Sequence, residues 1–296
     1  METLRILFYT DSADISEDIH IWGLTRLEQF IELKLASIVN IEIRILNRHI
    51  DYKNGHKYKY QATKLRKALL DQFDELWIFG ALPAPADKPE LTKPEIHDLT
   101  EWMKTGGVFI TGDHSIPMGR ATCKNSHASF VNLGSALGRQ IPRAKELREW
   151  DGPPTGCYEG PLSSRDNFNT QEGNNPLELD DTFLQEDGIP QQLYLVPPEN
   201  PHRLFWWYFD EATHQMVYIS RFPDHIHEGL LKFPIPQGAD WPPGSPPPKL
   251  VAQGRDKRFT DKFIDLVSVF EGTKDAGRIV ADSSFHHYIN KNLIGI

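Results

Sequence analysis

The stretch TKPEIHDLTEWMKTGGVFIT, residues 92–111, decides the fold that we expect for this chain. Thr92 and Glu95 have the spacing of a capping box, in which each side chain binds a backbone N–H group at the start of a helix. The helix is predicted to end before Gly106-Gly107, and the apolar run over residues 108–111 is predicted to form a strand. A helix that leads at once into a short apolar strand is typical of a βαβ unit in a parallel sheet.

On either side of this stretch, short apolar runs alternate with segments of helical periodicity. Strands are predicted over Leu4–Tyr9, Ile41–Leu46, Glu75–Phe79 and Gly277–Asp282. Helices are predicted over Ile19–Ile38, Gln61–Gln72 and Phe259–Phe270. This alternation predicts βαβ units and a mostly parallel sheet in a single α/β domain over residues 1–296.

Two regions depart from this pattern. Residues 139–190 and 222–256 are rich in Pro, Gly, Asn and Asp, and we predict that they form long loops over the active-site edge of the sheet. An antiparallel extension of the sheet is predicted from the strands Leu193–Val196, Leu204–Phe209 and Met216–Ser220. Within it, Trp206-Trp207-Tyr208 is expected to lie in the sheet core.

Composition narrows the class of protein. The chain has 296 residues, a formal net charge of −9 and two cysteines, Cys123 and Cys157. The acidic balance argues against a nucleic-acid partner, which favours a basic surface. No apolar stretch approaches the ~18 residues of a membrane span, and no signal peptide is recognised at the N-terminus. We therefore expect a cytoplasmic protein that acts on a small-molecule substrate or ligand.

Asp113 and His114 follow the strand 108–111, where the carboxyl ends of parallel strands form the ligand crevice. Carboxylate and neutral imidazole are standard ligands of zinc and related cations. The pattern predicts a metal-binding or acid–base pair. The alternative is that Asp113 caps the next segment and His114 makes an ordinary hydrogen bond.

A second group, Asp224-His225-Ile226-His227-Glu228, follows the run Met216–Ser220. In an extended segment His225 and His227 point to the same side, which suits shared coordination of one metal ion. Glu228 is then a candidate general base. The alternative is an exposed polar loop without a shared ligand.

The third group begins at Asp282, which ends the last predicted strand and is followed by His286-His287. Carboxylates at this position often take part in catalysis, and we predict that His286 faces the crevice. The alternative is that Asp282 caps a helix.

Three further features carry weaker signals. Asp11-Ser12 follows the first strand and either binds a substrate or caps the next segment. Arg143 belongs to a basic run that suits a phosphate or carboxylate of a substrate, although interleaved glutamates favour a solvated face. Cys123 lacks the surrounding sequence of a nucleophile elbow and is more simply a buried thiol.

The order helix, Gly106-Gly107, strand and Gly-containing turn resembles the central part of class I glutamine amidotransferase-like domains, including the ThuA-like group. This resemblance implies a three-layer sandwich around a flavodoxin-like, mostly parallel sheet. Gly277-Arg-Ile-Val280, followed by Ser and His, resembles the last strand of ThuA-like proteins. The three motifs Thr111-Gly-Asp-His114, Phe222-Pro-Asp-His-Ile-His-Glu-Gly229 and Asp282-Ser-Ser-Phe-His-His287 are similar to motifs in bacterial members of unassigned function. The turn that holds the catalytic Cys of true amidotransferases has Asp113-His114 here, so glutaminase chemistry is not implied.

These patterns predict a metal-dependent hydrolase that uses an Asp/His cluster at the carboxyl ends of the strands. Its metal ligands are predicted to be Asp113, His114, His225 and His227, and its catalytic residues Asp113, His114, Glu228, Asp282 and His286. The expected cofactor is a divalent metal ion, zinc or manganese. One alternative is a non-catalytic amidotransferase-like module that binds a ligand or partner. A third hypothesis is Cys123-dependent amide hydrolysis.

Overall fold

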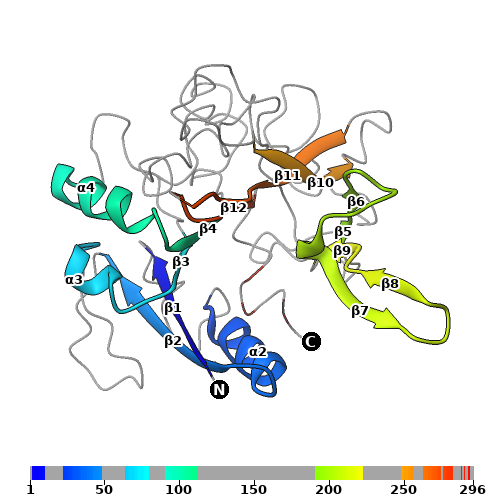
Figure 1. Ribbon diagram of the computed structural model, residues 1–296, viewed down its shortest axis with the longest axis horizontal. Coiled ribbons are helices and arrows are strands. Elements are labelled where there is room, and N and C mark those ends of the chain that lie inside the picture. The colour runs from blue at the N-terminus through cyan, green and yellow to red at the C-terminus, as the bar shows by residue number, and fades with distance from the viewer. Residues whose placement is uncertain are drawn as a thin grey trace, which may run out of the picture.

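The structure is a computed structural model, and it describes residues 2–10, 23–48, 64–79, 91–111, 191–222, 248–255, 263–274 and 276–282, with Tyr288, Asn290 and Leu293. Its main sheet has eight strands in the order β2-β1-β3-β4-β12-β11-β10-β6 (Figure 1). Their bounds are β1 Thr3–Thr10, β2 Asn40–Asn47, β3 Glu75–Phe79, β4 Gly107–Thr111, β6 Tyr194–Leu195, β10 Lys249–Arg255, β11 Phe263–Phe270 and β12 Ile279–Asp282.

The five strands β2-β1-β3-β4-β12 are parallel, and their order is that of a flavodoxin-like sheet. The sequence predicted all five of these strands, and their bounds agree to within two residues. The prediction of an α/β fold with a mostly parallel sheet is therefore confirmed. The sequences of β1, β3, β4 and β12 are nearly continuous apolar runs because a central parallel strand is covered on both faces, whereas the edge strand β2 alternates polar and apolar residues.

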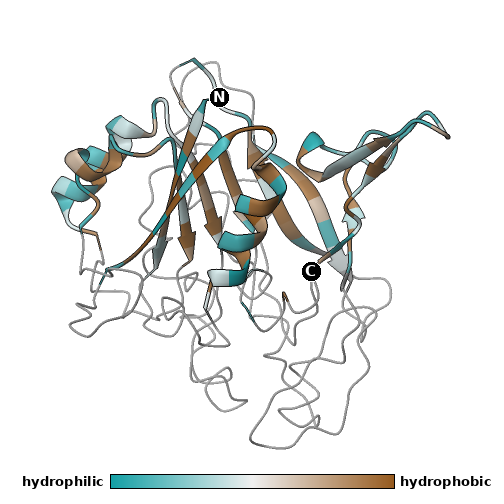
Figure 2. Ribbon diagram, turned by 90° about the horizontal axis from the view of Figure 1, so that it is seen from below, coloured by the Kyte–Doolittle hydropathy of each residue, from teal (hydrophilic) through white to brown (hydrophobic). Residues whose placement is uncertain are grey.

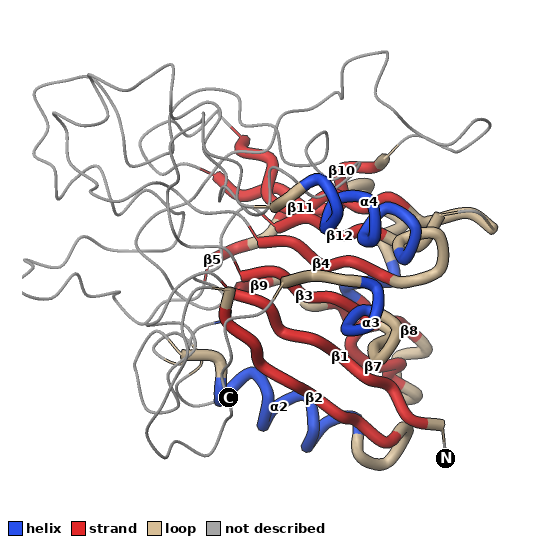
Figure 3. The backbone as a smooth tube through the Cα atoms, turned by 90° about the vertical axis from the view of Figure 1, so that its left-hand side faces the viewer, coloured by secondary structure: helices blue, strands red, loops and turns tan. Residues whose placement is uncertain are grey.

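Helices cover the two faces of this sheet, which makes the three layers (Figures 1 and 3). Helix α2 (Thr25–Leu35) packs on one face, whereas α3 (Lys67–Leu70) and α4 (Lys93–Trp102) pack on the other. Successive strand residues alternate between the faces: Leu76 and Ile78 of β3 belong to the α4 side, and Trp77 and Phe79 belong to the α2 side.

The predicted capping box is present at the start of α4. The Thr92 backbone N–H and hydroxyl both donate to Glu95 Oε2, at 2.9 and 2.8 Å. Glu95 is fully buried and also receives two hydrogen bonds from Arg48, the residue after β2, at 2.7 and 3.2 Å. The carboxylate that caps α4 thus also fastens the helix to the end of β2.

The end of α4 requires two glycines. A Cβ at Gly106 would overlap the Trp102 ring, and a Cβ at Gly277 would overlap the Gly106 backbone. Gly277 N–H donates to Met103 O at 2.7 Å, so the chain that enters β12 lies directly against the end of the helix. This contact places β12 beside β4.

The antiparallel part of the sheet contains one predicted strand, β6 within Leu193–Val196, and two segments that were not predicted to be strands. Residues 263–270 form strand β11, so the predicted helix over Phe259–Phe270 is wrong within the described residues. Strand β10 lies inside the predicted loop 222–256. Short apolar segments fit helix and strand alike by periodicity, and the buried β-branched Val267 and Val269 favour a strand between β10 and β12.

The region 191–222 supplies only β6 to the main sheet. Its other strands form two small sheets, β5 (Gln191–Gln192) with β9 (Arg221–Phe222), and β7 (Trp206–Asp210) with β8 (Gln215–Tyr218). The predicted strand from Leu204 begins instead with a 3₁₀ turn, η1 (Arg203–Phe205). The prediction that Trp206-Trp207-Tyr208 lies in the sheet core is wrong, because each of these residues is about half exposed, 50–52%. The β7–β8 hairpin projects from the main sheet (Figure 2), and among the described residues its two strands pair only with each other.

Two predicted helices are shorter than expected. Helix α2 occupies Thr25–Leu35 of the predicted range 19–38, and α3 is a single turn within the predicted range 61–72. Residues 36–38 form a turn after α2, and residues 64–66 precede α3 without helical structure. The apolar periodicity that marked these segments continues beyond the hydrogen-bonded turns, because residues flanking a helix can pack on the same core.

Candidate functional site

The carboxyl ends of the parallel strands lie side by side, as the prediction of the site requires. Thr10 of β1 pairs with Phe79 of β3, and Thr111 of β4 pairs with Asp282 of β12. Strands β3 and β4 join these two pairs, with Ile78 opposite Ile110. Four strands therefore end along one edge of the sheet, which we call the carboxyl edge.

Asp282 is the one predicted site residue that the structure describes. It ends β12 at the carboxyl edge, as expected, and its side chain is buried, with 0% of the residue exposed. The Tyr288 hydroxyl donates to Asp282 Oδ2 at 3.0 Å. A buried carboxylate that accepts a phenolic hydrogen bond fixes the direction in which the tyrosine ring points.

Asn290 explains why Tyr288 lies at this position. Its side-chain Oδ1 accepts the backbone N–H of Arg26 at 2.8 Å, and its Nδ2 donates to the Thr25 hydroxyl at 2.8 Å. Because Leu24, the residue before α2, offers no side-chain cap, Asn290 satisfies a free N–H group at the start of the helix from a distant part of the chain. The Tyr288 ring packs edge-to-face on Phe109, with 5.2 Å between the ring centroids.

Beside Asp282 and Tyr288 the structure has a cavity of about 520 Å³, which we call the sheet groove. Its floor is the α2 face of the sheet, one wall is α2, and the opposite wall comes from the region 204–222. In Figure 2 the strands beside α2 are mainly hydrophobic in colour. The lining side chains are mostly apolar and include Leu27, Phe30, Ile31, Trp77, Phe109, Leu204, Phe205, Ile219, Phe222, Val267 and Val280. Volume and lining both suit one small-molecule ligand.

The sheet groove has a polar group at each end. Asp282 and Tyr288 lie at the carboxyl edge, and Glu75 and Arg278 lie at the opposite edge. Glu75 accepts the Trp77 indole N–H at 2.8 Å, and Arg278 pairs with Glu271 at 2.9 Å. The charged groups at the far end are therefore already bonded to neighbouring side chains.

The other predicted site residues lie outside the described part of the chain. They are Asp11, Ser12, Asp113, His114, Arg143, His225, His227, Glu228 and His286. Cys123 also lies outside the described residues. Within the described ranges no group of three or more His, Cys, Asp or Glu side chains could hold a metal ion. The predicted metal ligands thus remain a prediction.

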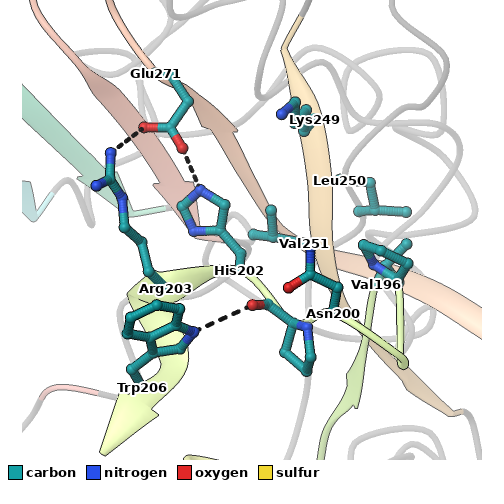
Figure 4. A pocket seen from close by; sticks show the side chains of 11 residues that line it. Val196, Asn200, His202, Arg203, Trp206, Lys249, Leu250, Val251 and Glu271 are labelled. Atoms are coloured by element: carbon teal, nitrogen blue, oxygen red, sulfur yellow. Dashed lines mark hydrogen bonds and ion pairs between the residues drawn. The ribbon is translucent and has the colours of Figure 1, made fainter.

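A second cavity, of about 680 Å³, opens near the edge of the sheet opposite the carboxyl edge (Figure 4). Its polar centre is Glu271, the residue after β11, which contacts His202 Nε2 and Arg278 and lies 4.0 Å from Arg203. Burial raises the pKa of Glu271, but the His202 hydrogen bond and the two arginines outweigh this effect and hold the pKa below its ordinary value.

His202 in this cavity is not available as a base or metal ligand. Its Nδ1 accepts the Leu204 backbone N–H at 3.1 Å, which leaves the ring proton on Nε2, where it faces Glu271. Both ring nitrogens are engaged, and together they tie the 3₁₀ turn η1 to the end of β11. The cluster therefore acts as a structural clamp between the region 191–222 and the main sheet.

The sequence predictions did not include Tyr288 or the lining of the sheet groove. A usable signal was present in the strands: Trp77, Phe109 and Val280 occupy equivalent alternate positions of β3, β4 and β12, so they share one face. Tyr288 carried no local signal, because the contacts that position it, to Asp282 and through Asn290 to α2, form only in the folded chain. The described residues contain no helix long and apolar enough to cross a membrane.

Comparison with known proteins gives no assignment of function. No protein-family model matches the chain, and no curated protein matches it. Among solved structures, it is similar to a protein from Bacteroides uniformis described as ThuA-like, at 12% identity and a TM-score of 0.40, with 98% of this chain and 84% of that chain covered. It is also similar to Agd3, a carbohydrate deacetylase, at 7% identity and a TM-score of 0.40, with 95% and 29% covered. We therefore base the fold on the strand order and the function on the site.

Proposed function

We propose that this protein is a metal-dependent hydrolase whose reaction centre lies at the carboxyl edge of the sheet, beside Asp282. Asp113, His114, His225 and His227 would hold a divalent ion, zinc or manganese, from the donor types that such ions prefer. A bound cation lowers the pKa of its water and polarises the bond to be cleaved. Glu228 and His286 would move protons, and Asp282 would orient Tyr288 toward the substrate.

The observation that carries the proposal is the position of Asp282. It is a buried carboxylate at the end of β12, in register with Thr111 of β4. In the sequence, Asp113 and His114 follow Thr111 by two and three residues, and each residue spans at most ~3.6 Å. This short connection supports a position for both residues near the carboxyl edge.

The groups that contain His225 and His286 are also joined to the carboxyl edge or the sheet groove by short stretches of sequence. Phe222 lines the sheet groove together with Asp282, and His225 follows it by three residues. His286 lies in the sequence between Asp282 and Tyr288, which are hydrogen-bonded to each other. These short connections support a single centre that draws on all three Asp/His groups.

Metal content tests the proposal. Protein purified without chelator should carry near-stoichiometric zinc or manganese by elemental analysis, and His225→Ala with His227→Ala should remove it without loss of the circular dichroism signal. His97→Ala is the matched control, because His97 is an exposed histidine on α4. Absence of metal from the parent, together with no change in melting temperature on adding zinc, manganese or magnesium, would exclude the metal centre.

Activity on a panel of esters, amides and phosphoesters tests the role of Asp282. Asp282→Asn keeps an acceptor for Tyr288 but removes the charge, and we expect a loss of about 10–100-fold in kcat/KM with the metal retained. Cys123→Ser should leave that activity intact. A complete loss in Cys123→Ser with a native fold would instead favour Cys123-dependent amide hydrolysis.

The predominantly apolar lining of the sheet groove favours a second candidate function, a non-catalytic module that binds a small ligand. The two functions differ in their need for metal. Ligand binding that persists in the double histidine variant, with no hydrolysis by the metal-loaded parent, would support the binding module over the enzyme.

A further inference from the structure

The sheet groove has the shape of a channel along the strands. Arg278, just before β12, and Asp282, at its end, both line it, so it runs the length of this strand. Four residue steps at ~3.3 Å each give a length of roughly 13 Å, which matches an extended chain of about ten carbon atoms. A long, narrow floor favours a linear group over a compact one.

The sides of this channel are closed by apolar groups from two separate elements. Leu27 and Ile31 of α2 form one side, and Phe205 and Ile219 form the other. These four residues are at least partly buried. The channel is thus a slot between α2 and the region 204–222, with Trp77, Phe109 and Val280 along its floor.

Charge is distributed so that the two ends favour different groups. At the far end, the carboxylate of Glu75 accepts a hydrogen bond from Trp77, and the guanidinium of Arg278 pairs with Glu271. The apolar end of a ligand would therefore leave neither charged group without a partner. At the carboxyl edge, Asp282 is the charged residue among the described lining groups. Its carboxylate disfavours an anionic group there and suits a neutral one beside the Tyr288 hydroxyl.

We propose that the sheet groove binds the acyl chain of a neutral single-chain amphiphile of about ten carbons, with its ester or amide head group at Asp282 and Tyr288. This inference rests on the proposed function, because it names the substrate class of that reaction centre. The chain would lie along β12 and β4 with its methyl end toward Gly107. Hydrolysis would add water across the acyl bond, releasing the fatty acid and the alcohol or amine of the head group.

Binding can be measured without catalysis. We would titrate the uncharged fluorescent probe N-phenyl-1-naphthylamine into the full chain in the presence of a chelator, and then displace it with n-alkanols of six to fourteen carbons. Each added methylene should tighten binding about three- to four-fold until the channel is full, near ten carbons. The gain should then level off.

Two substitutions alter the channel at different depths. Gly107→Leu adds a side chain at the far end, where a Cβ would meet its nearest atoms at 3.7 and 3.9 Å, an ordinary contact. It should move the levelling-off point to chains two to three carbons shorter. Val280→Phe fills the middle of the floor and should abolish displacement by the longer alkanols. Leu33→Phe adds similar bulk on the exposed side of α2 and should change neither result.

The outcomes separate this inference from the proposed function. Absence of probe binding, or binding that is the same in Gly107→Leu and Val280→Phe as in the parent, would overturn the acyl-chain site, even if metal and hydrolase activity are found. If Val280→Phe fails to fold, the shift in Gly107→Leu decides. Chain-length-dependent binding without hydrolysis of neutral acyl esters or amides by the metal-loaded protein would retain the site and overturn the hydrolase.

Discussion

Glu95 and Glu271 are both carboxylates held by arginine, but they differ in their depth in the molecule. Glu95 lies in the first turn of α4 with no exposed surface, and its partner Arg48 has a side chain that is 7% exposed. Glu271 lies at the margin of the second cavity beside Arg278 and His202, and about a quarter of its side chain is exposed. The first pair stands near the carboxyl edge, and the second pair stands near the opposite edge.

The difference shows how burial changes the role of an ion pair. Around Glu95, both carboxylate oxygens are occupied, by Arg48, by Thr92 and by the backbone N–H of Leu65 at 3.0 Å. Water cannot replace any of these donors if one is removed. Around Glu271, water can replace a lost partner, so the cluster should orient its surroundings more than it stabilises them.

The largest effect should come from breaking the buried pair. Arg48→Met removes the guanidinium and leaves the Glu95 carboxylate buried with an incomplete set of donors. We expect a loss of about 3–5 kcal/mol in the free energy of unfolding, measured by chemical denaturation. A loss below ~1 kcal/mol would mean that water reaches Glu95 and that the contrast with Glu271 is wrong.

The free energy of unfolding at low pH tests the role of the buried Glu95 carboxylate. Burial raises the pKa of Glu95, but hydrogen bonds from Arg48 and Thr92 outweigh it, so its pKa lies below the ordinary value. A carboxylate with a lowered pKa in the folded state adds stability above its unfolded pKa of ~4.3, and this stability is lost as the pH falls through the lower folded value.

We therefore expect the free energy of unfolding of the parent to fall as the pH is lowered below about 4.3. Glu95→Gln, which cannot titrate at this position, should show a flatter profile over the same range, although it is less stable at neutral pH. Parallel profiles for the parent and Glu95→Gln would contradict the assignment of a lowered pKa to Glu95.

A smaller effect is expected at the opposite edge. Glu271→Gln keeps the size of the side chain and removes the charge shared by His202, Arg203 and Arg278. The free energy of unfolding should fall by about 1 kcal/mol or less, and by less still at high salt, because these arginines are partly exposed. Denaturation at two ionic strengths measures both effects, and a salt-independent loss would argue for a buried pair.

The smallest effect should come from an ion pair on the surface, between Lys104 and Glu101. Lys104 Nζ lies 2.6 Å from Glu101 Oε2 at the end of α4, and about half of each side chain is exposed. Lys104→Met should leave the melting temperature unchanged within error, because exposed pairs of this kind are screened by water and salt. A clear shift in melting temperature would show that the exposure of these ion pairs does not predict their contributions to stability.

Local sequence patterns determined much of the parallel half of this protein. Short apolar runs at residues 75–79 and 108–111, separated by a capped helix, predict neighbouring parallel strands because each is covered on both faces. The Thr92 and Glu95 spacing predicted the start of α4 because a capping box involves only residues within one helical turn. The position of Asp282 at a strand end followed from the same local pattern.

Only the tertiary structure decided the rest, because the deciding contacts join residues far apart in sequence. Residues 263–270 are a strand because β10 and β12 supply hydrogen bonds on both sides, although their local pattern also fits a helix. Trp206-Trp207 is half exposed because the β7–β8 hairpin lies apart from the main sheet. Arg48 meets Glu95 only after the sheet has brought the ends of its strands together along one edge.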